Sequence, residues 1–229
     1  MHPVKIEIFD STDPQHKMAR ALFESAKDLP LICPHGHVDP SLFVTSEAKF
    51  SDPAALFITP DHYVLRMLIS QGFSYEELGV FPIEEADLAY DPLSVWRIFC
   101  ENFNLFDGTP TGLWIQNELA MVFGIYEKPD AQNAEILYWQ VHEALAREGF
   151  SPQHLYHQFN IETLCTTDSP EKPLDSHQAI KASGWGGELR PTFRADKLIH
   201  IGLSDWADRI QTLGAILGEE VKSFKSYLL

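Results

Sequence analysis

A chain of 229 residues, of which 45% are hydrophobic and 22% charged, is long enough to bury a core as one large domain or two small ones. The 33 acidic against 17 basic residues give a formal net charge of −16, which argues against nucleic acid and anionic membranes as partners. The three cysteines lie far apart, no apolar run approaches the roughly 18 residues of a membrane span, and the first residues lack the pattern of a signal peptide. We therefore expect a reduced, cytoplasmic protein.

The first expected elements are a helix and a strand. A helical period runs over residues 14–27, with Asp13 as its N-cap. The run LPLIC, residues 29–33, is bounded by proline and too brief for a helix, which predicts a short buried strand. The sequence PHGH follows this strand directly.

Helices are expected to dominate residues 51–158. The first of four segments in this part opens on Pro60 and closes on Gly72, and the others begin at aspartate or threonine near proline or alanine and carry an amphipathic stripe, which is typical of helices. They cover residues 60–72, 91–106, 109–125 and 130–150. The expected core of this helical part consists of Trp96, Phe99, Phe103, Leu113, Leu119, Phe123, Leu137, Val141 and Leu145.

Strands and helices are expected to alternate after residue 159. A strand in NIETLCTTDSP is followed by a helix over residues 175–183, a strand in ELRPTFRADK, and one or two helices from Ser204 that break near Gly218. This alternation predicts an α/β fold with a parallel sheet built from βαβ units. We expect three parts, with boundaries at 1–50, 51–158 and 159–229.

Polar side chains follow all three expected strands. His35 and His37 come after the first, Thr166, Thr167 and Asp168 end the second, and Arg194 and Asp196 follow the third. Ligands of parallel sheets bind at the carboxyl ends of the strands. The agreement between the three ends predicts a functional site there.

His35 and His37 are two residues apart, so both side chains point to one face of an extended segment. Two imidazoles on one face can bind one divalent ion, with a carboxylate to complete the site. The glycine between them leaves the backbone unobstructed. The alternative is that two histidines meet by chance in a chain that has 10 of them.

Two further candidates have equally simple structural explanations. Asp61, His62 and Tyr63 lie in the first turn of an expected helix, where Asp61 suits the helix dipole and Tyr63 suits an amphipathic surface. Arg194 could bind a substrate carboxylate through two hydrogen bonds, or it could form a salt bridge to Asp196. The Thr166–Asp168 segment could be no more than a capped turn.

Taken together, four segments resemble one enzyme family. LPLICPHGHVDPSLF, TPDHYVLRMLISQG, FNIETLCTTDSP and RPTFRADK occur in the order and rough spacing seen in uronate isomerases, the glucuronate isomerase family of the amidohydrolase superfamily. The segment NELAMVFGI also looks like the helical insertion of that family. The resemblance extends over essentially the whole chain.

The resemblance implies a fold and an activity. By resemblance, we expect this chain to share the family's metal-dependent (β/α)₈ TIM barrel with a helical subdomain inserted after the first strand. The family interconverts D-glucuronate with D-fructuronate, and D-galacturonate with D-tagaturonate. By resemblance, His35 and His37 bind the metal, zinc, and His35 counts among the catalytic residues. Tyr63 moves a proton between C2 and C1, and His62 and Arg194 hold the hexuronate substrate.

Length is the one large departure from the family. Family chains are roughly twice as long, and a barrel of this type needs eight strands. We therefore expect the N-terminal half of a uronate isomerase, inactive alone, whose partner is a missing C-terminal half or further copies in a homo-oligomer. The alternatives are a metal-dependent hydrolase of the same superfamily, or a non-catalytic oligomerising or sugar-binding fragment.

Overall fold

The computed structural model describes residues 13–82 and 90–228. The expectation that no signal peptide is present rests largely on residues 1–12, which lie outside the described residues. Within the described part, no helix combines the length and the apolar character that crossing a membrane requires.

Two compact units make up the chain. One comprises residues 1–27 and 49–151, and the other comprises residues 28–48 and 152–229. We call them the helical unit and the sheet unit. The three domain boundaries expected from the sequence stay predictions, because a division by contacts identifies compact units and not independently folding domains.

The helical unit contains the helices that the sequence predicts, with cap residues that explain where they begin. Asp13, Asp52, Asp91 and Thr109 each accept a backbone hydrogen bond and each precede a proline at the first helical position. The segment 91–106 divides into an α-helix and a 3₁₀ turn at Asn102. The elements are α1 (Pro14–Ala26), α2 (Pro53–Phe57), α3 (His62–Ile69), α4 (Pro92–Glu101), η3 (Phe103–Phe106), α5 (Pro110–Phe123) and α6 (Ala134–Ala146).

Aromatic side chains fill the core of the helical unit. Trp96 is fully buried, its ring contacts Phe57 and Phe99, and its indole N–H donates to the Ala134 carbonyl at 2.9 Å. Most of the expected core residues are buried, whereas Leu113 and Phe123 are half-buried. The sequence therefore predicted this core well, because the apolar stripes of α4 and α6 face each other.

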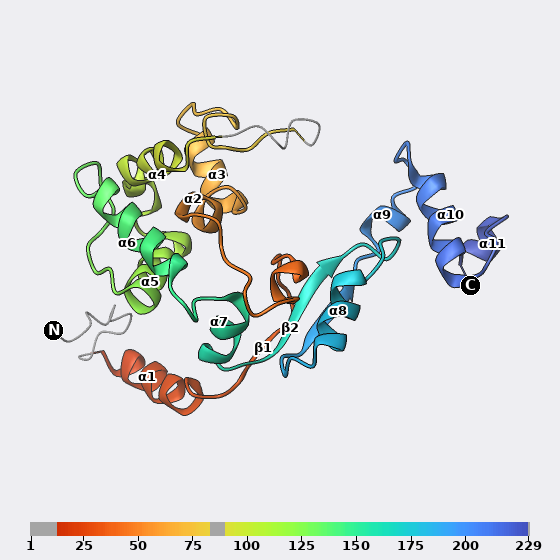
Figure 1. Cartoon of the computed structure of the whole chain (residues 1–229), viewed down its shortest axis with the longest axis horizontal. Coiled ribbons are helices and arrows are strands. Elements are labelled where there is room, and N and C mark those ends of the chain that lie inside the picture. The colour runs from red at the N-terminus through yellow and green to blue at the C-terminus, as the bar shows by residue number, and fades with distance from the viewer. Residues whose placement is uncertain (1–12, 83–89, 229) are drawn as a thin grey trace. The chain divides into compact units, whose positions relative to one another are not determined.

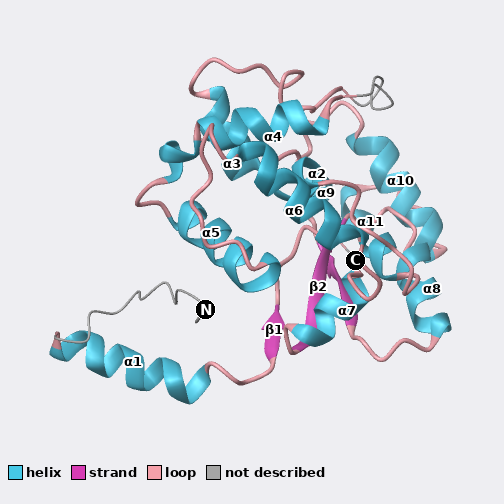
Figure 2. Cartoon of the chain, turned by 60° about the vertical axis from the view of Figure 1, so that its left-hand side comes forward, coloured by secondary structure: helices cyan, strands magenta, loops and turns pink. Residues whose placement is uncertain are grey.

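The sheet unit has the expected α/β architecture with a small parallel sheet. Its three strands run in the order β1-β2-β3, and both pairs are parallel, with Thr166 opposite Pro191 and Thr167 opposite Thr192. Figure 2 shows these strands side by side in magenta. The elements are β1 (Leu31–Cys33), η1 (Pro40–Phe43), α7 (Pro152–Gln158), β2 (Ile161–Asp168), α8 (Asp175–Ser183), β3 (Leu189–Phe193), α9 (Asp196–Ile199), α10 (Trp206–Leu217) and α11 (Phe224–Tyr227).

Helix α8 and a small apolar cluster cover one part of the sheet. Phe43, Tyr156 and Ile180 form this cluster, and α8 runs along β2 in Figure 1. The Tyr156 hydroxyl donates to the Glu162 carbonyl at 2.6 Å and accepts from the Glu188 amide at 3.0 Å, so it joins the beginnings of β2 and β3. Burial raises the pKa of Tyr156, which keeps this hydroxyl a donor.

One expectation about the sheet is wrong. The first strand was expected to be buried, but 50% of Leu31 and 64% of Ile32 are exposed. Among the described residues, strand β1 pairs only with β2, and those that cover the sheet pack near β2 and β3 instead. An apolar run predicts a strand, but only the neighbouring elements decide whether it is covered.

Two glycines explain local features near the ends of this unit. Helix α10 stops where the sequence predicts, because Gly218 adopts φ 72°, a left-handed conformation that suits glycine.

A Cβ atom on Gly36 would lie 2.9 Å from the backbone oxygen of Cys165 in β2. The expectation that Gly36 leaves the backbone unobstructed is confirmed, and the reason is the close approach of β2.

Candidate functional site

The three strand ends lie at one edge of the sheet, as expected for parallel strands. His35 and His37 follow β1, Thr166, Thr167 and Asp168 complete β2, and the Arg194 amide donates to the Asp168 carbonyl at 3.3 Å beyond β3. The parallel register brings these segments together although they are far apart in the sequence.

His35 and His37 converge. Their Nε2 atoms are 3.0 Å apart, and their ring planes are inclined by 85° with centroids at 4.7 Å. The close approach of Gly36 to Cys165 holds the segment between them against β2. Both side chains are exposed in this chain, so their nitrogens are accessible to a ligand.

The two nitrogens suit a shared metal ion. Two imidazole nitrogens bound to one tetrahedral zinc ion, each at 2.0–2.1 Å, lie about 3.3 Å from each other. The observed 3.0 Å is close to this value. No group of three or more His, Cys, Asp or Glu side chains within residues 13–82 and 90–228 could hold a metal ion. The described residues therefore bring together two side chains that could bind a metal ion, and a complete site would need at least one more ligand.

Thr167 of β2 is the side chain that contacts this pair. Its hydroxyl oxygen lies 3.1 Å from the Gly36 carbonyl and 3.4 Å from Nδ1 of His37. The sequence predicts Thr167 near the site but indicates no role for it beyond a turn. Its contact depends on the β1–β2 register, which local sequence does not report.

A second polar cluster lies around Thr166 on the same strand. The buried Thr166 hydroxyl donates to Asp168 Oδ2 at 2.6 Å and lies 2.8 Å from Nε2 of His177 on α8. Nδ1 of His177 is buried and has no hydrogen-bond partner among the described residues. His177 was not predicted from the sequence, because only the packing of α8 against the sheet brings it to Thr166.

Arg194 forms the salt bridge that the sequence left open. Its Nε atom lies 3.1 Å from Asp196 Oδ2, and 41% and 68% of the two side chains are exposed. An exposed pair of this kind contributes little to stability. The hydrogen bond and charge of Arg194 lower the pKa of Asp196, so this partner stays ionised. A role of Arg194 in substrate binding stays a prediction.

His62 and Tyr63 belong to the helical unit. Asp61 is the N-cap of α3 and accepts from the amides of Tyr63 and Val64, which confirms its expected structural role. The rings of His62 and Tyr63 lie with centroids 4.2 Å apart, and the Arg66 guanidinium lies 4.9 Å from the Tyr63 ring centre. On this unit, 49% of Tyr63 is exposed.

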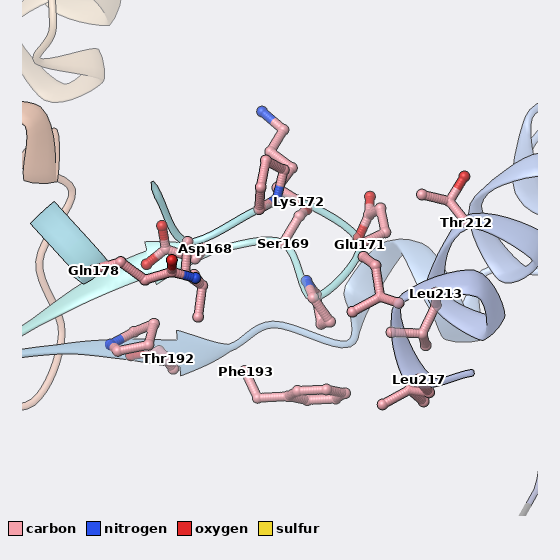
Figure 3. Close-up of a pocket in the computed structure, with 15 residues that line it drawn as sticks. Asp168, Ser169, Glu171, Lys172, Gln178, Thr192, Phe193, Thr212, Leu213 and Leu217 are labelled. Carbon is pink, nitrogen blue, oxygen red and sulfur yellow. The ribbon is translucent and has the colours of Figure 1, made fainter. Parts of the chain in front are cut away.

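A pocket of about 680 Å³ lies beside the ends of β2 and β3 (Figure 3). Asp168 and Thr192 line one side of it, and Phe193, Leu213 and Leu217 line the other. The two histidines are not among the residues that line it. Because the α10 side is apolar, the pocket does not suit a polar sugar acid, and we do not assign it as a substrate site.

An ion-pair network connects the loop after β2 to α10 near this pocket. Arg209 lies 2.5 Å from Glu171 and 2.5 Å from Asp205. Burial alone would raise the pKa of Glu171, but its backbone hydrogen bond and Arg209 outweigh this and lower it. The network therefore keeps Glu171 ionised against α10.

Comparison with known proteins identifies the family. The family model for glucuronate isomerase matches residues 11–229. The chain belongs to this family. The resemblance of the four sequence segments to uronate isomerases is thereby confirmed.

Individual relatives agree with this family. The uronate isomerases of Nostoc punctiforme and Rhizobium meliloti are each 41% identical, over 93% and 96% of this chain. A crystal structure of glucuronate isomerase from Caulobacter crescentus matches 98% of this chain with a TM-score of 0.88 and 39% identity. These matches cover 45%, 47% and 47% of the relatives, so this chain spans about half their length.

Proposed function

We propose that this chain supplies the first part of the active site of a uronate isomerase, which interconverts D-glucuronate with D-fructuronate and D-galacturonate with D-tagaturonate. The observation that carries the proposal is the convergence of His35 and His37 at the end of β1, in a member of the glucuronate isomerase family.

His35 and His37 are the proposed ligands of a divalent metal ion, with zinc the expected metal. The 3.0 Å separation of their Nε2 atoms and the chemistry of imidazole support this assignment. A bound ion would polarise a substrate oxygen as a Lewis acid. A carboxylate from outside the described residues would complete the site, since only two ligand side chains come together here.

The other proposed roles follow from what isomerisation requires. A proton must leave the carbon next to a carbonyl while negative charge is held on the oxygens. Tyr63 would move this proton between C2 and C1, and the 49% exposure of this residue supports the assignment. His62 and Arg194 would hold substrate oxygens, and the guanidinium suits the carboxylate of a hexuronate.

Completion of a TIM barrel belongs to the same proposal. Strands β1 and β3 are the outer strands of the described sheet, and each pairs on one side only. Free edges and exposed apolar side chains favour pairing with further strands. Residues 51–158 would be the helical subdomain inserted after β1. A cytoplasmic location and a homo-oligomeric assembly stay predictions.

Complementation tests the proposal. The chain is co-expressed with the second half of the Caulobacter crescentus enzyme, and turnover of D-glucuronate to the keto-sugar is measured with and without a chelator. We expect no turnover by the chain alone and chelator-sensitive turnover by the complex. The matched control is the His35→Ala/His37→Ala double variant in the same complex, which should be inactive.

Other outcomes would contradict parts of the proposal. Turnover by the chain alone that survives the chelation control would contradict the need for further strands. A stable complex without turnover would favour a non-catalytic sugar-binding or oligomerising role. Hydrolysis of a lactone or an amide without a keto-sugar product would favour a hydrolase.

A further inference from the structure

The hydroxyl group of Thr167 has a defined direction. Its oxygen lies 3.1 Å from the Gly36 carbonyl oxygen, which can only accept a hydrogen bond. Thr167 has one hydroxyl proton, so this proton points to Gly36. The lone pairs of the same oxygen are then left to face other donors.

The direction of the Thr167 hydroxyl decides the protonation of His37. Nδ1 of His37 lies 3.4 Å from the Thr167 oxygen. Because the hydroxyl proton is used at Gly36, this contact is a hydrogen bond only if Nδ1 carries the proton. In a neutral imidazole the other nitrogen, Nε2, then carries the lone pair.

His35 must then have the opposite tautomer. Its Nε2 atom lies 3.0 Å from Nε2 of His37, with the two rings nearly perpendicular. Since Nε2 of His37 carries a lone pair, Nε2 of His35 must donate its proton. The two histidines are therefore not equivalent in the metal-free chain, although the sequence gives both the same neighbour, Gly36.

We propose that Thr167 is a positioning residue that fixes the Nδ1–H tautomer of His37 and so directs a free Nε2 lone pair toward His35. Alternation along β2 separates this role from that of Thr166, whose hydroxyl contacts Asp168 and His177 on the other side of the strand. A hydrogen bond from outside a ligand histidine commonly fixes its tautomer and ring orientation.

A consequence concerns metal binding and rests on the proposed function. A metal that binds both histidines needs a lone pair on each Nε2 atom. His37 already offers one, whereas His35 must lose its Nε2 proton to solvent and take up another at Nδ1. The net charge of the ring does not change. His35 is therefore the ligand whose tautomer changes when a metal binds.

Nitrogen-15 NMR of the histidine rings in the metal-free chain tests the first step. The variants are Thr167→Val, which removes the hydroxyl at similar volume, and Thr167→Ser, which keeps it. Thr192→Val is the matched control, because Thr192 lies opposite Thr167 on β3. His35→Gln and His37→Gln assign the two rings, and circular dichroism verifies that every variant is folded.

We expect mainly Nδ1–H at His37 and Nε2–H at His35. Thr167→Val should lower the Nδ1–H to Nε2–H ratio of His37 roughly threefold to tenfold, the effect of one neutral hydrogen bond. Thr167→Ser and Thr192→Val should keep the original ratio. Predominant Nε2–H at His37, or an unchanged ratio in a folded Thr167→Val protein, would overturn the proposal.

Titration with zinc tests the second step separately, in the complex with the second half of the Caulobacter crescentus enzyme that would supply the missing ligand. We expect the proton of His35 to move to Nδ1 while His37 keeps its tautomer. A switch at His37 instead would overturn the assignment of the two roles. Ring signals that do not respond to zinc would contradict the metal role under the proposed function, while the metal-free spectra still decide the role of Thr167.

Discussion

The helical unit and the sheet unit differ in how much of their apolar surface is buried. In the helical unit, helices α2 to α6 enclose a continuous core in which Trp96, Phe99 and Phe103 are fully buried. In the sheet unit, the buried cluster on the sheet comprises Phe43, Tyr156 and Ile180, while 70% of Phe193 and 67% of Leu217 are exposed.

The difference indicates where stability resides and where further contacts are expected. Burial of apolar area is the main favourable term in folding. The helical unit therefore makes most of its stabilising apolar contacts within this chain. The described residues of the sheet unit expose apolar side chains and unpaired strand edges, which are typical of surfaces that contact further protein segments. The proposed metal ligands His35 and His37 lie on the less covered unit, and the chain spans about half the length of its relatives.

Removal of the central tryptophan should have the largest effect. Trp96→Ala removes a fully buried ring and its hydrogen bond to Ala134, and we expect a loss of about 3–5 kcal/mol in the free energy of unfolding. Urea denaturation measures this. Labelling of Cys100 reports the same unit, because this thiol is buried and burial raises its pKa.

Trp139→Ala is the matched control, since 47% of that side chain is exposed on α6. A similar loss in both variants would contradict the assignment of the core to Trp96.

Two isoleucines on α10 test how far the sheet unit is packed. Ile210 is 3% exposed and Ile216 is 55% exposed on the same helix. We expect Ile210→Ala to destabilise the unit by about 2–4 kcal/mol, because it leaves a cavity, and Ile216→Ala to change stability by less than about 0.5 kcal/mol. Urea denaturation followed by tryptophan fluorescence measures both. Equal effects would show that the exposed face is covered in solution.

The glycine between the histidines should have a smaller but specific effect. Gly36→Ala would bring a Cβ atom to 2.9 Å from the Cys165 backbone oxygen, so β2 or the histidine segment must shift. We expect a loss of about 1–3 kcal/mol and changed ring signals of His35 and His37. Gly186→Ala is the control, because nothing lies within 4 Å of its added Cβ. Unchanged histidine signals in Gly36→Ala would contradict the close approach.

The Glu171–Arg209 pair should contribute least to the free energy of unfolding, and it should contribute only above acidic pH. The folded pKa of Glu171 is lowered, so its contribution is present above the unfolded value of about 4.3 and is lost as pH falls through the folded pKa. We expect Glu171→Gln to lower stability by about 1 kcal/mol at pH 7, since Arg209 stays partly solvated.

Denaturation of both proteins at pH 7 and pH 3 measures this difference. The two proteins should converge at the lower pH. A difference that persists there would assign the effect to packing instead of charge.

Local sequence patterns predicted most of the elements. The caps Asp13, Asp61 and Thr109 mark where helices begin, and α8 occupies the predicted residues 175–183. These features depend on neighbours a few residues away, which is why a linear pattern suffices. The pair His35 and His37 was predictable for the same reason.

Features that depend on distant segments were not predictable from local patterns. His177 meets Thr166 only through helix packing, and Thr167 meets His37 only through strand register. The predicted burial of β1 was wrong because apolar residues specify a strand but not what covers it.

The sequence by itself determined the family, the start of several helices, the parallel sheet and the two converging histidines. These properties follow from cap residues, hydrophobic periods and motif spacing, which are short-range. Only the tertiary structure decided that Thr167 faces His37 and that the sheet unit keeps an exposed apolar surface. Both depend on which segments pack together in space, and packing is a property of pairs of segments that no single stretch of sequence contains.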